Sequence, residues 1–147
     1  MSESADEVPL GEYVKIWNNL NTASKICPGN FNGKPDDFPD FTFKFMNYIS
    51  GYPGSTMKDD LGSMIPKAPS EFLDNIKERS TLVSINRMSE REKIMARGIM
   101  RLLKVLCTEH ALSIIKSMPK DESENGFEAW RLMHAEYAPN LSSRSTA

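Results

Sequence analysis

The chain has few cysteines, no long apolar run and no large charge of one sign. Its 147 residues include two cysteines, Cys27 and Cys107, which argues against a disulfide scaffold and fits a reducing compartment. No segment approaches the roughly 20 apolar residues of a membrane-spanning helix. The first residues, MSESADEVPLGEY, are acidic where a signal peptide needs a basic start. We therefore expect a soluble, cytoplasmic protein with no membrane partner.

Catalytic motifs are also missing. The sequence has no Gly-rich phosphate loop, no G-x-S-x-G and no H-E-x-x-H. Cys107 and His110 have the spacing of two metal ligands, but a structural zinc site needs four. We interpret Cys107 as a buried thiol and His110 as a residue in the first turn of a helix. A Cys–His nucleophile pair is the lesser alternative, because no third, orienting residue can be named. The sequence predicts no enzyme, cofactor, metal or small-molecule substrate.

Apolar residues at helical spacing are what the sequence does contain. Hydrophobic residues make up 39% of the chain, enough for one buried core. The spacing predicts an all-α, compact bundle of five or six helices, with no confident strand. The stripes are Tyr13, Ile16, Trp17 and Leu20; Phe38, Phe41, Phe45, Tyr48 and Ile49; Met95, Ile99, Leu102, Leu103 and Leu106; Ala111, Leu112, Ile115 and Met118; and Phe127, Trp130, Met133, His134 and Tyr137.

The helix ends carry recognisable signals. Ser89 and Glu92 form a capping box before residues 89–106, and Asn125 with Glu128 resembles a second one. Ser70 is placed to cap a helix carrying Phe72, Leu73 and Ile76. We expect the last helix to end at Ala138, because the residue before proline avoids helical geometry.

Loops are predicted from proline, glycine and polar clusters. Residues 27–35 form a loop in which Phe31 is a buried anchor. Residues 52–69 are expected to be irregular, with one helical turn from Met57 to Met64. The stretch KDESEN, residues 120–125, is interpreted as a solvated turn.

These signals predict three parts. Residues 1–10 form a flexible acidic arm, residues 11–139 a helical domain, and residues 140–147 a linker or the truncated start of a following domain.

Four basic residues share one sector of the helix over residues 89–106, opposite its apolar stripe. Between Arg87 and Lys104 the sequence has six basic and two acidic residues. A solvated outer face is the simpler interpretation. The alternative is a basic ridge that contacts RNA or an acidic partner. The ridge consists of Lys93, Arg97, Arg101 and Lys104.

Residues 31–49 and residues 126–139 form two aromatic-rich segments, and together they resemble the Gag capsid region of copia-type LTR retrotransposons. FNGKPDDFPDFTFKFMNYI, residues 31–49, is similar to the aromatic-x-Gly loop and aromatic-rich helix that open this region. GFEAWRLMHAEYAP, residues 126–139, is similar to its later Ala-Trp-x-x-Leu/Met-x-x-x-Tyr segment. The order and spacing of both segments carry the resemblance, which covers roughly residues 27–147.

The resemblance implies an all-helical capsid N-terminal domain that packs with copies of itself into a virus-like particle around retrotransposon RNA. RNA contact would be indirect, because the zinc-knuckle pattern is missing from this chain. No catalytic residue is implied. The motif positions are expected in the core: Phe31, Phe38, Phe41, Trp130 and Tyr137.

Two other functions stay open. The chain could be a helical interaction module, a domesticated Gag relative or an adaptor, that binds a peptide or partner helix. An aromatic-lined groove near Phe31, Phe38 and Tyr48 would favour that function. An RNA-binding regulator that uses the basic ridge is the third hypothesis.

Overall fold

The computed structural model describes residues 8–23, 25–58, 61–77, 79, 81–82 and 84–146. Residues 1–7 of the predicted acidic arm lie outside this range, and Leu10 already belongs to a helix. Within the described residues the chain folds into six α-helices, three short 3₁₀ helices and one two-stranded sheet. The expectation of an all-α bundle of five or six helices is therefore confirmed.

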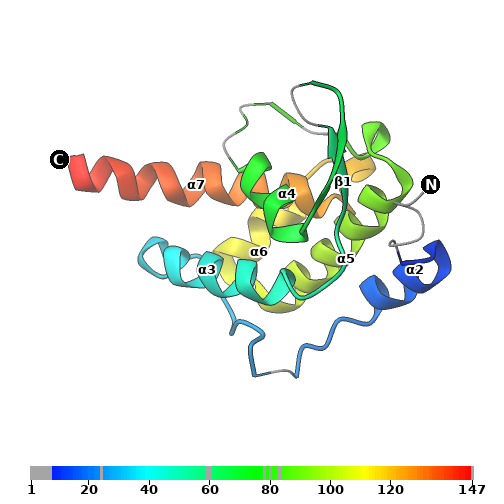
Figure 1. Ribbon diagram of the computed structural model, residues 1–147. Coiled ribbons are helices and arrows are strands. Elements are labelled where there is room, and N and C mark those ends of the chain that lie inside the picture. Colours follow the sequence, from blue (N-terminus) through cyan, green and yellow to red (C-terminus); the bar gives the residue numbers. More distant parts are fainter. Residues whose placement is uncertain are drawn as a thin grey trace.

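The elements follow the chain in a simple order (Figure 1). They are α2 (Leu10–Asn18), η1 (Pro35–Asp37), α3 (Phe38–Ile49), β1 (Ser55–Lys58), β2 (Met64–Lys67), α4 (Pro69–Ile76), η2 (Ile85–Arg87), α5 (Glu90–Leu106), α6 (Glu109–Lys116), η3 (Lys120–Glu122) and α7 (Gly126–Thr146).

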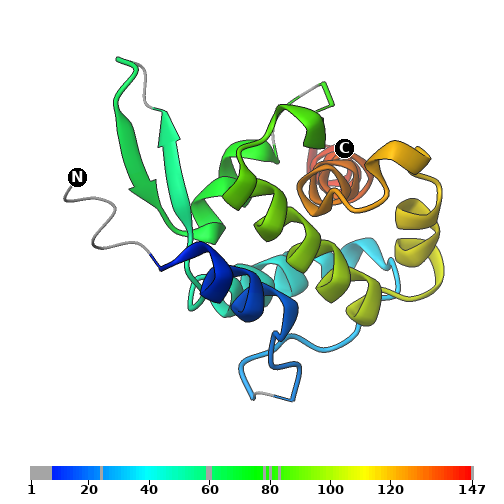
Figure 2. The same cartoon turned by 90° about the vertical axis from the view of Figure 1, so that its right-hand side faces the viewer.

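Helix α5 lies between α2 and α7 and packs against both (Figure 2). Helix α7 also contacts α4 and α6, while α3 packs on α4. The first residue of α7 approaches α5 closely. A Cβ on Gly126 would lie 2.5 Å from the carbonyl oxygen of Ala96, so only glycine fits at this crossing.

The predicted apolar stripes form the core. The five stripe residues on α3 and the five on α5 are all buried. On α7 the buried stripe residues are Phe127, Trp130, Met133 and Tyr137. On α2 the buried pair is Tyr13 and Trp17. Because these helices bury one face each against a shared interior, hydrophobic burial is the main force that holds the bundle together.

The capping signals are confirmed in part. Ser89 Oγ accepts from the Glu92 amide at 3.2 Å, and the Glu92 carboxylate accepts from the Ser89 amide at 2.8 Å. Ser70 is not a cap, because α4 begins one residue earlier at Pro69. The Glu71 carboxylate instead accepts from the Ala68 amide at 2.7 Å. Proline at the first position starts the helix upstream of the serine.

The prediction of an irregular 52–69 connection with a helical turn is wrong. Strands β1 and β2 pair antiparallel, with Ser55 opposite Lys67 and Met57 opposite Ile65. The hairpin projects from the helical body in both views (Figures 1 and 2). At its base, Trp17 Nε1 donates to the Pro53 carbonyl at 3.1 Å. Cross-strand pairing gives the backbone of residues 55–58 and 64–67 hydrogen-bond partners along the whole hairpin, whereas a single helical turn would satisfy few of these groups.

The predicted end of the last helix is also wrong. Helix α7 continues through Pro139 to Thr146 and extends beyond the rest of the fold (Figure 1). A proline inside a helix removes one N–H donor and crowds the carbonyl four residues earlier, which destabilises or kinks the helix. The preference of the residue before proline for an extended conformation is therefore not an absolute helix stop.

Candidate functional site

The two segments that carry the Gag resemblance meet in one aromatic cluster. Phe31 stacks on Phe41 with ring centroids 5.0 Å apart and meets Tyr137 edge to face at 5.2 Å. Phe38 lies 5.2 Å from Tyr137. The cluster joins the 27–35 loop, α3 and α7 into one unit, and Trp130 extends it through a 4.9 Å contact with Phe45. All five predicted motif positions are buried in the core.

Backbone contacts fix the loop that presents Phe31. The Phe31 amide donates to the Leu106 carbonyl, and the Thr108 amide donates to the Phe31 carbonyl, both at 2.9 Å. These bonds form a parallel bridge between Phe31 and Cys107 at the corner between α5 and α6. The aromatic anchor is thus held from both its side chain and its backbone.

Gly33 explains the aromatic-x-Gly spacing. Its φ is +100°, a conformation that side chains with a Cβ disfavour. A Cβ on Gly33 would also lie 2.8 Å from His110 Cβ and 2.8 Å from the Tyr137 hydroxyl oxygen. The turn can approach α6 and α7 only because this residue is glycine.

Polar atoms of α7 are enclosed by this aromatic packing. Trp130 Nε1, His134 Nε2 and the Tyr137 hydroxyl make no hydrogen bond within the described part of the protein. His134 lies between the rings of Phe38 and Trp130, at 4.9 and 5.0 Å. The pKa of His134 is lowered to about 4, first by burial and then by the charge of Lys77, while Asp74 acts in the opposite direction. His134 is therefore neutral at physiological pH.

The structure gives Cys107 and His110 different environments. Cys107 is buried, and burial raises the pKa of its thiol to about 12. A thiol with that pKa stays protonated, so it is a poor nucleophile. His110 is exposed, and its Nε2 lies 3.2 Å from Glu136 Oε2. Within the ranges that the structure describes, no three or more His, Cys, Asp or Glu side chains are grouped to hold a metal ion.

Neighbouring elements occupy part of the basic ridge on α5. Arg97 Nε lies 3.1 Å from Glu124 Oε1, in the turn before α7. Arg101 Nη1 donates to Asn18 Oδ1, at the end of α2. Lys93 is half-buried and Lys104 is exposed. The ridge keeps the positive charge of Arg101, because its partner is a neutral amide.

The aromatic groove that would favour an interaction module is not formed by the residues we named. Phe31, Phe38 and Tyr48 are each 2% exposed and face the core. The Tyr48 hydroxyl donates to the Asn21 carbonyl at 2.8 Å and also contacts the Tyr52 hydroxyl. These three side chains are therefore almost completely covered, and Phe31 lines a hollow of about 200 Å³.

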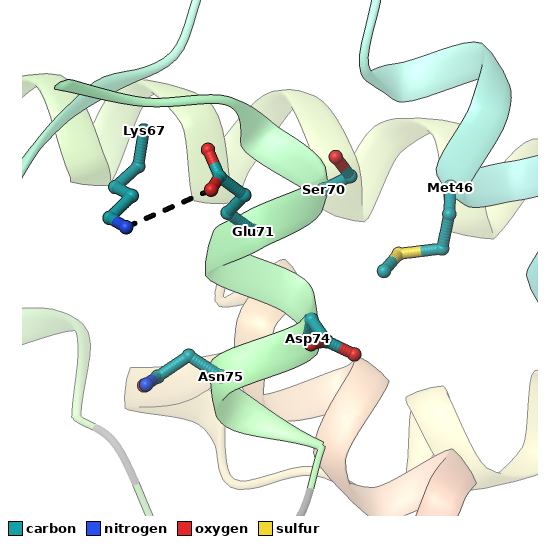
Figure 3. A pocket seen from close by; sticks show the side chains of 6 residues that line it. All are labelled: Met46, Lys67, Ser70, Glu71, Asp74 and Asn75. Carbon is teal, nitrogen blue, oxygen red and sulfur yellow. Dashed lines mark ion pairs between the residues drawn. The ribbon is translucent and has the colours of Figure 1, made fainter.

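A different hollow lies between α3 and α4. It has a volume of about 400 Å³ and is open to solvent. Figure 3 shows Met46 reaching from α3 toward α4 across this space. We call it the α3–α4 groove; its lining residues are Met46, Lys67, Ser70, Glu71, Asp74 and Asn75.

The interpretation of KDESEN as a solvated turn is correct for Lys120, Asp121, Ser123 and Glu124, which are exposed, but wrong for Glu122 and Asn125, which form a buried polar network. Glu122 is only 3% exposed. Its carboxylate accepts from Ser84 Oγ at 2.9 Å, from the Ile85 amide at 3.0 Å and from Asn125 Nδ2 at 2.8 Å. These donors compensate the loss of hydration that burial imposes on the charge.

The same network starts α7. Asn125 Oδ1 accepts from the Glu128 amide at 3.1 Å, which confirms Asn125 as an N-terminal cap. The Glu128 carboxylate accepts from Arg131 Nη2 at 2.6 Å and from Arg131 Nε at 2.8 Å. The sequence indicated only that a helix starts at this point. It did not indicate that Glu122 is buried, because two of its donors come from Ser84 and Ile85, which lie 38 and 37 residues away.

Comparisons with known proteins do not assign a family. No protein-family model, no curated protein and no solved structure matched this chain. None of the helices in the described ranges is long and apolar enough to cross a bilayer.

Proposed function

We propose that the chain is a structural, Gag-like capsid domain of a copia-type LTR retrotransposon. It associates with copies of itself into a cytoplasmic virus-like particle that packages the element's RNA, and it has no catalytic role. The fold class is the all-α bundle described above; its capsid-like character is part of this proposal.

One observation carries the proposal. The two segments that resemble Gag lie about 80 residues apart in the sequence, yet Phe31 and Phe38 both contact Tyr137 at 5.2 Å. The shared motif positions thus belong to one packing unit. Two aromatic helices that matched the family only by chance would not need to contact each other. The protonated thiol of Cys107 supports a non-catalytic role.

Sedimentation velocity over a concentration series tests self-association. We expect weak association that strengthens with protein concentration and with salt. Salts such as sulfate, which are excluded from the protein surface, strengthen apolar contacts between copies. Negative-stain microscopy at millimolar protein with added RNA should show particles. A strict monomer at millimolar concentration, without particles, contradicts the proposal.

The basic ridge gives a separate test of RNA contact. Charge reversal by Arg97→Glu and Arg101→Glu should abolish RNA retention and its dependence on salt, if the ridge contacts phosphates. Lys116→Glu, an exposed change on α6, is the matched control. If the wild-type chain retains no RNA at low salt, packaging does not run through this ridge.

The second candidate is a helical interaction module, and the α3–α4 groove is the feature that favours it. A module would bind a peptide or partner helix there and would show no self-contacts. A pull-down that recovers one partner from a chain that stays monomeric would favour this function over a capsid domain.

A further inference from the structure

Phe43 is a large apolar side chain on the outer face of α3. It is 73% exposed, whereas Phe41 and Phe45 on the same helix are buried. At about 100° per residue, position 43 points directly away from the buried stripe. An exposed aromatic residue is unremarkable alone, so its surroundings decide its meaning.

The α3–α4 groove begins one helical turn from Phe43. Met46, three residues further along α3, extends into this groove toward Asp74 of α4 (Figure 3). Residues three apart are neighbours on a helix surface, so the ring of Phe43 and the methionine at the groove lie on one continuous face. The face therefore presents an apolar projection beside a hollow of about 400 Å³.

The charges around this face cancel locally. Asp40 pairs with Lys44 at 3.2 Å, Glu71 with Lys67 at 3.8 Å, and Asp74 with Lys77 at 2.8 Å. At the groove Lys67 and Lys77 balance Glu71 and Asp74, and on α3 beside Phe43 Lys44 balances Asp40. A surface of this kind can approach its own copy without like-charge repulsion.

We propose that a second copy of this chain docks on this face, with Phe43 of each copy filling the α3–α4 groove of the other. A two-fold interface needs a projection and a complementary hollow on the same patch, because each copy uses the same surface. The side chains of one α3 would then interdigitate with those of α3 and α4 of its partner, as the side-chain rows of packed helices do. This inference rests on the proposed self-association and names the surface that carries it.

Sedimentation equilibrium of the full chain tests the contribution of Phe43. Phe43→Ala should weaken dimerisation by about tenfold or more, since burying a phenylalanine is worth about one factor of ten in affinity or more. Val105→Ala, which trims a 58% exposed residue on α5, is the matched control and should leave dimerisation unchanged. A monomeric wild-type chain at millimolar concentration, or a Phe43→Ala variant that dimerises normally, overturns the inference.

A mixing experiment tests the geometry. Asn75→Trp fills the groove and keeps Phe43, while Phe43→Ala removes the projection and keeps the groove. Each variant alone should dimerise poorly, whereas their mixture restores one of the two contacts and should form a heterodimer. Ser70→Trp fills the groove from another position and replaces Asn75→Trp if that variant does not fold. A mixture that associates no better than either variant alone contradicts the two-fold arrangement.

The capsid proposal and this inference fail differently. If particles form equally well from Phe43→Ala, the capsid function stands and this surface is wrong. If the wild-type chain dimerises but forms no particles, and Phe43→Ala abolishes the dimer, the surface stands and the capsid function is wrong.

Discussion

Phe31 meets Tyr137 edge to face, with ring centroids 5.2 Å apart and the ring planes at 84°. This contact joins an irregular loop to a helix that begins almost 100 residues later. Edge-to-face packing directs the positive rim of one ring at the face of the other, which adds specificity to the hydrophobic burial. The loop and α7 therefore depend on each other, and changes at either should weaken both.

Gly33→Ala should destabilise the fold. The positive φ of Gly33 costs about 1–2 kcal/mol for a residue with a Cβ, and the new methyl would also crowd His110 and the buried Tyr137. Urea unfolding should show at least this loss. Gly29→Ala, where a Cβ meets nothing within 4 Å, is the control and should change stability by less than about 0.5 kcal/mol. Equal stability of the two variants would refute the role given to Gly33.

Trp130→Ala should cost about 3–5 kcal/mol, because it leaves a large cavity in the core. The indole is fully buried and packs on Phe45 and His134. Thermal and urea unfolding would measure the loss. Phe43→Ala is the control at an exposed aromatic position and should leave monomer stability nearly unchanged. A melting temperature of Trp130→Ala close to that of the wild type would show that α7 does not depend on this ring.

The helices were predictable from the sequence because each buries a stripe at the helical period. The hairpin was not, because four-residue strands are too short to show alternation and Pro66 argues against a strand. Helix α7 passes Pro139 because a local preference does not fix a helix end.

In the candidate site, only the residues that are buried by hydrophobic packing could be predicted from the sequence. Phe31, Trp130 and Tyr137 are apolar at helical or loop-anchor positions, and their burial follows. Glu122 is a carboxylate in an acidic segment, and its burial depends on donors from residues 84 and 85. The α3–α4 groove joins residues from three elements, so no single segment signals it.

His134 should make stability depend on pH between about 6.5 and 4. The pKa of His134 is lowered to about 4 in the folded protein, first by burial, so the unfolded chain binds a proton that the folded chain does not. The free energy of unfolding is therefore highest above pH 6.5 and falls as the pH drops toward 4, by up to about 3 kcal/mol. Lys77 and Asp74 have opposing effects on this pKa.

Urea unfolding at several pH values measures this dependence. His134→Gln should flatten the curve between pH 6.5 and 4, because the variant lacks the buried imidazole whose pKa is lowered in the folded protein. His110→Gln, at an exposed histidine on α6, should keep the wild-type slope. A slope that persists in His134→Gln would assign the pH dependence to other groups.

Glu122 should govern a second, more acidic range. Burial alone would raise the pKa of Glu122, but hydrogen bonds from Asn125, Ile85 and Ser84 outweigh it, and the pKa lies below its ordinary value of 4.5. Because the folded protein holds the charged form more strongly, this stabilisation is complete above about pH 4.5 and is lost as the pH falls through the folded pKa. Glu122→Gln should remove this loss from the acid limb of the stability curve.

At neutral pH, Glu122→Gln should destabilise the protein by about 1–3 kcal/mol, because the neutral amide cannot satisfy all three donors, which are buried or partly buried. Glu124→Gln, two residues away, removes only the exposed ion pair with Arg97 and should cost about 1 kcal/mol or less. The two carboxylates carry the same charge in the same turn, so burial and hydrogen bonding alone distinguish them. Equal losses in the two variants would show that Glu122 is a solvated residue, as the sequence first indicated.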